Sequence, residues 1–187
     1  MKRLSFLFLL VFLTACAGSG APTNYHDPNM DFASLRSVAV MPFVNLTRDN
    51  LAADRARDTF MNSLLATGAF YVVPSGEVAR GIARAGISNP AAPSAEEIAK
   101  LASIIKVDAV ITGAVLEYGE LRSGTTSANV VSMDVQMVEA QKQKVVWTAS
   151  STKGGISFWD RLFGGGGQPM NDVTKAATDD LINKLFQ

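Results

Sequence analysis

The chain contains 187 residues, with 17 basic and 17 acidic side chains, one histidine and one cysteine. This length suits one domain that buries roughly 70% of the surface of its unfolded chain. The balanced charge, without a basic patch or an acidic tail, argues against nucleic acid as a partner. A single cysteine excludes an internal disulfide and a zinc site built from thiolates.

The first residues have the layout of an export signal. Lys2 and Arg3 precede an apolar run, residues 6–13, that is too short to span a bilayer as a helix. The sequence Leu-Thr-Ala-Cys at 13–16 resembles the bacterial lipobox, in which a peptidase cuts before the acylated cysteine. We therefore expect residues 1–15 to be a signal peptide and Cys16 to carry acyl chains such as palmitate. An ordinary cleaved signal with an unrelated cysteine is the alternative.

Lipid on Cys16 is expected to hold the mature chain to a membrane. Each buried acyl methylene contributes roughly 0.8 kcal/mol, so two or three acyl chains hold firmly. Ala17 stands where inner-membrane retention usually has aspartate. By resemblance to lipoproteins of double-membrane bacteria, this implies the outer membrane, at its periplasmic face.

Residues 16–35 are predicted to be the lipidated cysteine and a flexible tether. Residues 17–32 contain Gly, Ser, Pro, Asn and Asp, which are typical of a linker, and if extended they could span about 50 Å. The only histidine, His26, falls in this stretch, so a Ser-His-Asp or Cys-His mechanism would lack its base inside the fold. We therefore predict no enzyme, no catalytic residue, no metal and no cofactor.

Residues 36–187 are predicted to form a single domain of alternating strands and helices. Ser94 and Glu97 have the spacing of a capping box, and Asn171 is placed to cap the last helix. Residues 119–124 are expected to be a turn, and alternating apolar residues over 129–138 indicate a half-exposed strand. The other predicted strands are 37–44, 70–73, 108–118 and 145–150, and the other helices lie at 51–65 and 76–85. The order β-α-β-α-α-β-β-β-α indicates an α/β fold, a mixed β-sheet with helices packed on it.

Several short motifs resemble one family of envelope lipoproteins. These are PFVN at 42–45, GAFYVV at 68–73, VDAVITG at 107–113, EYG at 117–119 and VWT at 146–148. The sequence is similar over residues 36–187 to the curli-secretion lipoprotein CsgG and to its shorter relatives, which include neisserial surface lipoproteins and the Pel polysaccharide lipoprotein PelC. The resemblance implies a fold like the N-terminal domain of TolB, ring-shaped homo-oligomers at the outer membrane, and a role in export.

The chain departs from the curli channel in the segments that build its pore. A membrane strand needs about 9–11 residues, so a membrane hairpin needs about 20 or more. Only the polar residues 119–128 join two of the predicted strands, and residues 154–169 have no alternating apolar pattern. We therefore expect no transmembrane barrel of its own, which favours the relatives without a pore.

The most informative candidate site is the aromatic segment, residues 154–168 (GGISFWDRLFGGGGQ). Helical spacing would gather its apolar side chains on one side of a turn flanked by glycines, which suggests a hinged flap. Three contacts fit this segment: its own domain, the membrane interface, and a neighbouring subunit or partner. By resemblance to PelC-like proteins, Trp159 would face the membrane. The predicted contact residues are Phe158, Trp159, Leu162 and Phe163.

Three other features are predicted to be structural. The four glycines at 164–167 lack the Lys-Ser/Thr of a phosphate loop, so they indicate a flexible linker. Asp179 and Asp180 diverge by about 100° on a helix, so we expect a solvated face rather than a metal pair. Trp147 is expected to lie in the core or on the sheet surface.

These observations predict a non-enzymatic, lipid-anchored outer-membrane protein. We expect it to form a homo-oligomeric ring and to serve an envelope export or secretion system, of the curli or exopolysaccharide kind. One alternative is an activator of a peptidoglycan synthase in a cell-wall synthesis complex, like LpoB, although the tether is short for that role. The other is an envelope enzyme, which the absence of clustered catalytic side chains argues against.

Overall fold

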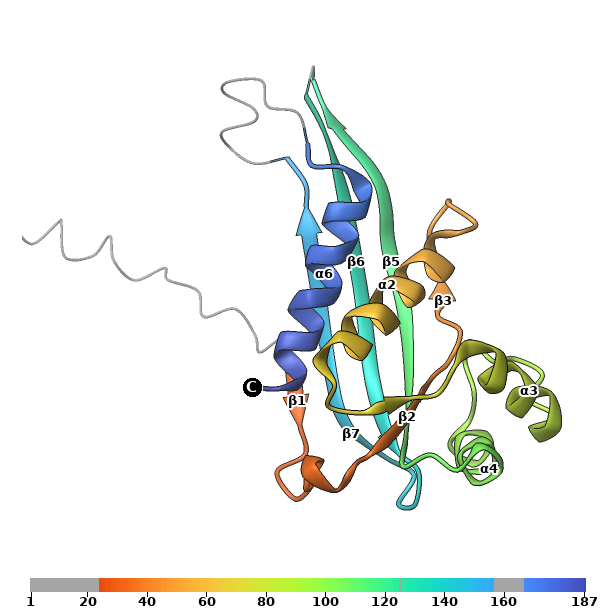
Figure 1. Ribbon diagram of the computed structural model, residues 1–187. Coiled ribbons are helices and arrows are strands. Elements are labelled where there is room, and N and C mark those ends of the chain that lie inside the picture. The colour runs from red at the N-terminus through yellow and green to blue at the C-terminus, as the bar shows by residue number, and fades with distance from the viewer. Residues whose placement is uncertain (1–23, 125, 157–166) are drawn as a thin grey trace, which may run out of the picture.

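In the computed structural model, residues 24–124, 126–156 and 167–187 are described, and they contain one seven-stranded mixed sheet (Figure 1). The strand order is β1-β7-β6-β5-β2-β4. Strand β3 also pairs with β5, at residues that follow those paired with β2. Strands β2, β3 and β4 run parallel to their partners, whereas β1, β5, β6 and β7 pair antiparallel with one another. The strands are β1 (Asn24–His26), β2 (Ser37–Val40), β3 (Val44–Asn45), β4 (Tyr71–Val72), β5 (Ala109–Ser123), β6 (Thr126–Glu139) and β7 (Lys144–Gly154).

Helices cover the two faces of this sheet unequally (Figure 1). Helices α2 (Ala52–Thr67) and α6 (Met170–Leu185) pack together on one face, over the larger core, which includes Phe60, Met133 and Trp147. Helices α3 (Ser75–Ala85) and α4 (Ala95–Ile105) pack on the other face against β2 and β5, over a smaller core. The rest of that second face carries Ser132, Asp134, Gln136, Ser150 and Thr152, all half-buried or exposed. The predicted mixed α/β fold is therefore confirmed, and no helix within residues 24–124, 126–156 and 167–187 covers the rest of the second sheet face.

The predicted turn at 119–124 is wrong. Strand β5 continues to Ser123 and pairs with β6 up to Thr126, so the two strands form a long hairpin that turns at Gly124. A bulge between Val115 and Glu117 shifts the alternation of side chains, which removes the pattern that would have marked a strand. Pairing with β6 along its length outweighs the weak strand propensity of the glycines and charged residues in this stretch.

Two other boundaries also differ from the prediction. The first strand is divided, because Pro42 lies between β2 and β3 and cannot donate to a ladder. Asn171 is not the cap of α6, which begins at Met170 after Pro169, whose carbonyl accepts from the Val173 N–H at 3.1 Å. The capping box of α4 is confirmed: the Ser94 hydroxyl accepts from the Glu97 N–H at 3.2 Å, and Glu97 accepts in return from the Ser94 N–H at 2.8 Å.

The tether predicted for residues 16–35 is wrong for its second half. Residues 24–26 form β1 at the edge of the sheet, and His26 pairs with Trp147 of β7. The His26 Nε2 lies 3.2 Å from the Leu185 carbonyl oxygen, and the imidazole packs edge-on against Phe32 in the short 3₁₀ helix η2 (Phe32–Ser34). His26 thus belongs to the folded body, and the reason given above for the lack of histidine chemistry does not hold. Its contacts with a carbonyl and an aromatic ring indicate a structural role.

Asp179 and Asp180 hold α6 in place rather than forming a solvated face. Asp179 accepts from the Ser63 hydroxyl of α2 at 2.9 Å. Asp180, whose side chain is 25% exposed, forms ion pairs with Lys153 of β7 at 2.8 Å and with Lys184 at 2.7 Å. Burial opposes ionisation of Asp180, but the hydrogen bonds from Lys153 and Lys184 outweigh it and lower the pKa of its carboxyl from 3.8 to about 2.

This pKa predicts how the stability of the fold depends on pH. A carboxyl whose pKa is lower in the folded state contributes stability above its unfolded pKa, and that contribution disappears as the pH falls from about 4 to about 2. Asp180→Asn should therefore lower the free energy of unfolding at pH 7 by about 1–2 kcal/mol, and by less as the pH approaches 2. Urea unfolding of both proteins across this range tests it. Asp172→Asn, on an exposed residue of the same helix, is the control and should change stability little. An equal loss for Asp180→Asn at pH 2 and pH 7 would contradict the assignment.

Candidate functional site

The five residues that the sequence predicts as functional lie outside the described residues. They are Cys16, Phe158, Trp159, Leu162 and Phe163. The residues on either side of 157–166 are described, and they lie at one end of the sheet. We call this the hairpin end: the β5–β6 turn at Ser123 and Thr126, the end of β7 at Gly154 and the start of α6 at Met170.

Both ends of the aromatic segment are bound to β6 at the hairpin end. The Gly155 N–H donates to the Asn129 carbonyl at 2.8 Å, and the Asn129 side-chain amide donates to the Gln168 carbonyl at 2.8 Å. A Cβ on Gly154, which has φ +81°, would lie 2.1 Å from the Asn129 oxygen, and one on Gly167 would lie 2.6 Å from the Ala128 Cα. These two glycines are therefore required for close contact with β6, whereas the sequence suggested hinges.

The described chain begins away from the hairpin end. Strand β1 is antiparallel to β7, with Asn24 opposite Ala149 and His26 opposite Trp147. Strand β1 therefore begins half-way along β7 and runs away from the hairpin end, toward the end of α6 at Leu185 (Figure 1). An ion pair between Asp27 and Lys144, at 2.6 Å, fixes the chain just beyond β1. Of the described residues that border the predicted functional segments, those on both sides of the aromatic segment lie at the hairpin end, whereas Asn24 does not.

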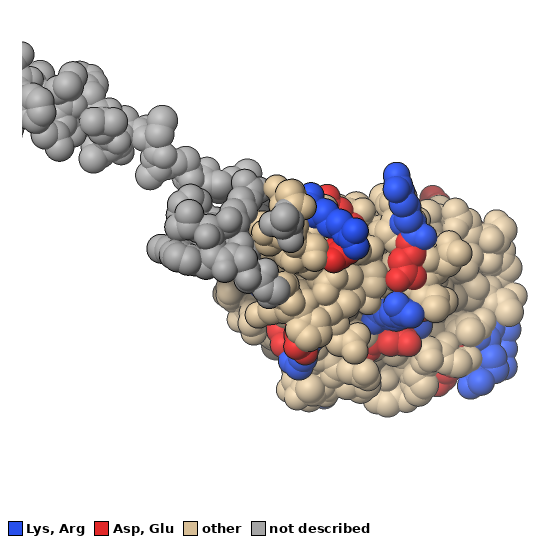
Figure 2. Space-filling model, turned by 90° about the horizontal axis from the view of Figure 1, so that it is seen from above, with Lys and Arg blue, Asp and Glu red and all other residues tan. Residues whose placement is uncertain are grey.

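The described surface of the hairpin end is mixed in charge. Figure 2, which views the molecule from above Figure 1, shows basic and acidic side chains next to one another among uncharged residues. The Arg122 guanidinium lies 2.8 Å from the Glu120 carboxylate on the hairpin, and Leu121 between them is 46% exposed. Paired charges of this kind give little attraction to anionic lipid, which is bound by clustered basic residues. Attachment of this end to a membrane would therefore depend on lipid and apolar groups.

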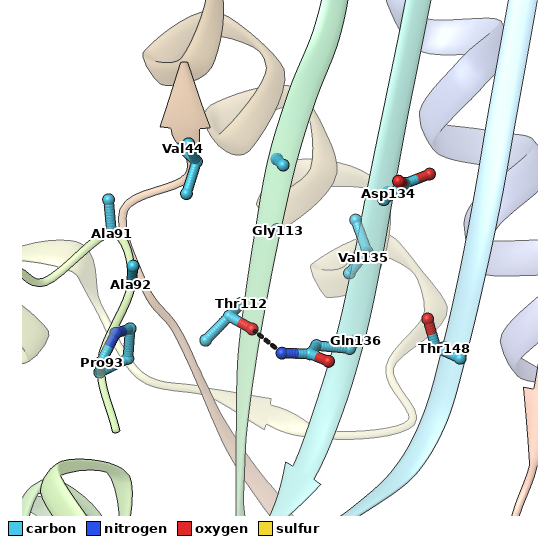
Figure 3. Close-up of a pocket in the computed structure, with 11 residues that line it drawn as sticks. Val44, Ala91, Ala92, Pro93, Thr112, Gly113, Asp134, Val135, Gln136 and Thr148 are labelled. Atoms are coloured by element: carbon cyan, nitrogen blue, oxygen red, sulfur yellow. Dashed lines mark hydrogen bonds between the residues drawn. The ribbon is translucent and has the colours of Figure 1, made fainter. Parts of the chain in front are cut away.

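A groove of about 480 Å³ lies on the sheet face that α3 and α4 leave open (Figure 3). Its floor is polar: Thr112 on β5, Asp134 and Gln136 on β6, and Thr148 on β7, with the Gln136 amide donating to the Thr112 hydroxyl at 3.0 Å. Its wall is apolar and consists of Ala91, Ala92 and Pro93 in the α3–α4 loop, with Val44. Among the described residues its lining has one carboxylate, Asp134, beside hydroxyl and amide groups, so the floor suits hydrogen bonding to a polar partner.

The described residues contain neither a cluster that could bind a metal nor a helix that could span a membrane. Within residues 24–124, 126–156 and 167–187, no three His, Cys, Asp or Glu side chains gather as a metal site would require. In the same ranges, no helix has both the length and the hydropathy to cross a bilayer. Trp147 is fully buried in the larger core, as expected.

Comparison with known proteins identifies the family. The sequence model of the family described as "Putative lipoprotein GNA1162-like" matches residues 28–160, more than half of the chain. This chain belongs to the GNA1162-like lipoprotein family. A comparison with curated proteins gives no significant match.

Solved structures share the fold. PelC from Paraburkholderia phytofirmans, solved as a dodecamer, is 18% identical with a TM-score of 0.58, over 86% of this chain and 95% of that one. GNA1162 from Neisseria meningitidis is 21% identical with a TM-score of 0.58, over 81% and 98%. The LpoB C-terminal domain from Salmonella enterica reaches a TM-score of only 0.49 at 16% identity, over 63% of this chain and 81% of that one. This similarity is too low to indicate a shared function. At these identities the likeness to PelC and GNA1162 establishes the fold.

Sequence reasoning missed the groove and the convergence at the hairpin end. The outward positions of β6 were visible as the alternation of Ser132, Asp134 and Gln136 with apolar residues. That alternation does not reveal which part of the sheet face the helices leave open. The convergence at the hairpin end depends on hydrogen bonds of Asn129 with Gly155 and Gln168, which are far from it in the chain and leave no sequence pattern.

Proposed function

We propose that this chain is a non-enzymatic outer-membrane lipoprotein that assembles into a ring and serves an envelope export system. The fold would be that of the CsgG and TolB N-terminal-domain group, of which PelC is a member by the resemblance described above. Residues 1–15 would be the signal peptide, lipid on Cys16 the anchor, and the hairpin end the side that faces the membrane. The single observation that supports this orientation most is the attachment of both ends of the aromatic segment to Asn129 of β6, at the hairpin end.

The length of chain between Cys16 and the fold supports a body held close to the membrane. Asn24 is the first residue of β1, so eight peptide units separate it from Cys16. Fully extended, they span about 28 Å, roughly half of the reach expected from the sequence. A tether this short keeps the folded body near the lipid and disfavours an activator that must reach across the periplasm to a cell-wall synthase.

The ring is supported by the fold that this chain shares with PelC, which was solved as a dodecamer. The open face of the sheet, where polar side chains of β6 and β7 have no helix over them among the described residues, is a separate surface that a partner can contact. In this proposal the ring lies on the periplasmic face of the membrane. The exported material moves past the ring or binds to it.

The anchor predicts the outcome of one substitution. Cys16→Ser removes the only thiol that can be acylated, so it should abolish labelling with radioactive palmitate and leave an uncleaved precursor. Labelling of whole cells followed by immunoprecipitation measures this, with Ser19→Ala as the matched control that should label fully. Equal label on Cys16→Ser and wild type would contradict the anchor.

The ring predicts the mass of the native complex. Full-length lipoprotein extracted in mild detergent should have a mass of several subunits by native mass spectrometry or by sedimentation with correction for bound detergent. The complex should persist on dilution to micromolar concentration, as expected of an interface that works in the membrane. A monomeric mass at every concentration would contradict the ring.

The aromatic segment predicts a contact with lipid. Burial of Trp159 and Phe163 in the interface should contribute at most about 1.5–3 kcal/mol each, less the cost of ordering the segment. Because an acyl anchor contributes far more, Trp159→Ala should leave the protein in the membrane fraction. It should instead alter the seating of the body and reduce export.

Vesicles that contain brominated phospholipid test this contact, because bromine quenches only a tryptophan that reaches the acyl region. Wild-type fluorescence should be quenched, and Trp159→Phe should show no quenching, since the remaining Trp147 is fully buried in the core. Unquenched wild-type emission would mean that the segment packs on its own domain or on a neighbouring subunit.

A further inference from the structure

Two apolar features lie at opposite ends of helix α2, and no part of the chain that the structure describes covers either of them. At the start of the helix, Leu46 is 62% and Leu51 is 53% exposed. At its end, a pocket of about 250 Å³ opens between η2, the loop before β4 and the end of α6. We call the first the leucine loop (residues 46–51) and the second the aromatic pocket, lined by Phe32, Phe70, Leu185 and Phe186.

The leucine loop is rigid, although it is exposed. The Asn45 side chain accepts from the Thr47 N–H at 3.0 Å and donates to the Asp49 carbonyl at 2.8 Å. The Asp49 carboxylate accepts from the Leu51 N–H at 2.8 Å and lies 3.3 Å from the Arg55 guanidinium. These bonds fix both leucines before any partner arrives, which reduces the entropy that binding would cost.

Leu51 also breaks a local rule of helix construction. It occupies the N-cap of α2 without a side-chain cap, where Ser, Thr, Asp or Asn would satisfy an orphan N–H. A polar residue at that position would stabilise the helix more than this exposed apolar side chain does. Local choices that disfavour the isolated fold are expected where a sequence also serves a contact.

The aromatic pocket is equally well formed. Phe70 stacks on Phe186 with ring centroids 5.9 Å apart, and His26 holds Phe32 edge-on at 5.5 Å. Phe186 remains 50% exposed on its rim. A preformed apolar cavity that opens on solvent suits an inserted aliphatic side chain better than water.

Charges around the two features are complementary. Asp31 and Arg36 flank the aromatic pocket, and Arg48 and Asp54 flank the leucine loop; all four are exposed. None of the four forms an ion pair within the described part of the chain. When the leucine loop of a second copy enters the pocket, its Arg48 faces Asp31 and its Asp54 faces Arg36. These two attractions favour one orientation of the contact.

We propose that the leucine loop of each subunit inserts into the aromatic pocket of the next copy of this chain. The 16 residues of α2 separate the two features by about 24 Å, and Figure 1 shows the ends of this helix on opposite sides of the molecule. Two different surfaces on opposite sides make a head-to-tail contact, which repeats from copy to copy and gives a ring when the rotation between copies closes. This inference rests on the ring proposed above and names the surfaces that form it.

The test uses full-length lipoprotein in detergent, with mass measured by sedimentation. A loop variant, Leu46→Ser with Leu51→Ser, and a pocket variant, Phe186→Asp, should each weaken self-association at least tenfold while the thermal unfolding midpoint changes little. The control Leu121→Ser removes a similarly exposed leucine at the hairpin end and should assemble like wild type. Assembly of the loop and pocket variants like wild type would overturn the inference and leave the ring standing, whereas a monomeric wild type would overturn the ring itself.

Mixing the variants distinguishes a head-to-tail contact from a symmetric one. The loop variant retains an intact pocket, and the pocket variant retains an intact loop, so an equimolar mixture should form heterodimers and nothing larger. A charge exchange gives a second test: Arg36→Asp or Asp54→Arg alone should weaken the ring, and the double variant should regain most of the loss. The absence of a heterodimer in the mixture would overturn the proposed contact. So would a double variant whose loss of self-association equals the sum of the two single losses.

Discussion

The continuous antiparallel pairing of β5, β6 and β7 is the constraint on which the rest of the structure depends. Strand β6 is paired with β5 along its whole length and with β7 from Val130 to Glu139, so its register fixes the bulge in β5, the turn at Gly124 and the position of Asn129. Asn129 in turn binds both ends of the aromatic segment, and β7 supplies the edge on which β1 pairs. One hydrogen-bonded register thus places both ends of the aromatic segment beside the turn of the β5–β6 hairpin.

Helix α6 makes this arrangement stable because it covers the apolar face of β6 and β7 and returns the chain from the hairpin end. Its apolar side contacts Met133 and Trp147 through the larger core, and Asp180 ties it to Lys153 near the end of β7. The opposite face is only partly covered by α3 and α4. The subunit therefore has one closed side, which provides the stability, and one open side, whose polar groove is available to a partner.

The sequence predicts those elements that are marked by a local pattern. It does not predict the strands that form only because they pair with a strand far away in the chain. The capping box of Ser94 and Glu97 and the alternation along β6 are local, and both are found as expected. The end of β5 was missed because Gly119 and the charged residues after it have weak strand propensity and are held extended by β6. His26 was assigned to a linker because its three-residue strand exists only through β7. The candidate site follows the same division, since Cys16 and the aromatic segment have sequence patterns, whereas the groove and the aromatic pocket are formed by residues far apart in the chain.

The proposed anchor restricts which assemblies the proposed ring can adopt. If every subunit carries lipid within about 28 Å of Asn24, the start of β1 must lie near the same membrane in all subunits. Cyclic symmetry about an axis normal to that membrane satisfies this requirement, whereas a dihedral assembly would turn half of the anchors away. A contact through the two ends of α2 is compatible with cyclic symmetry, because it joins unlike surfaces. The polar groove shares no lining residue with the leucine loop or the aromatic pocket, so this contact leaves the groove free for a partner.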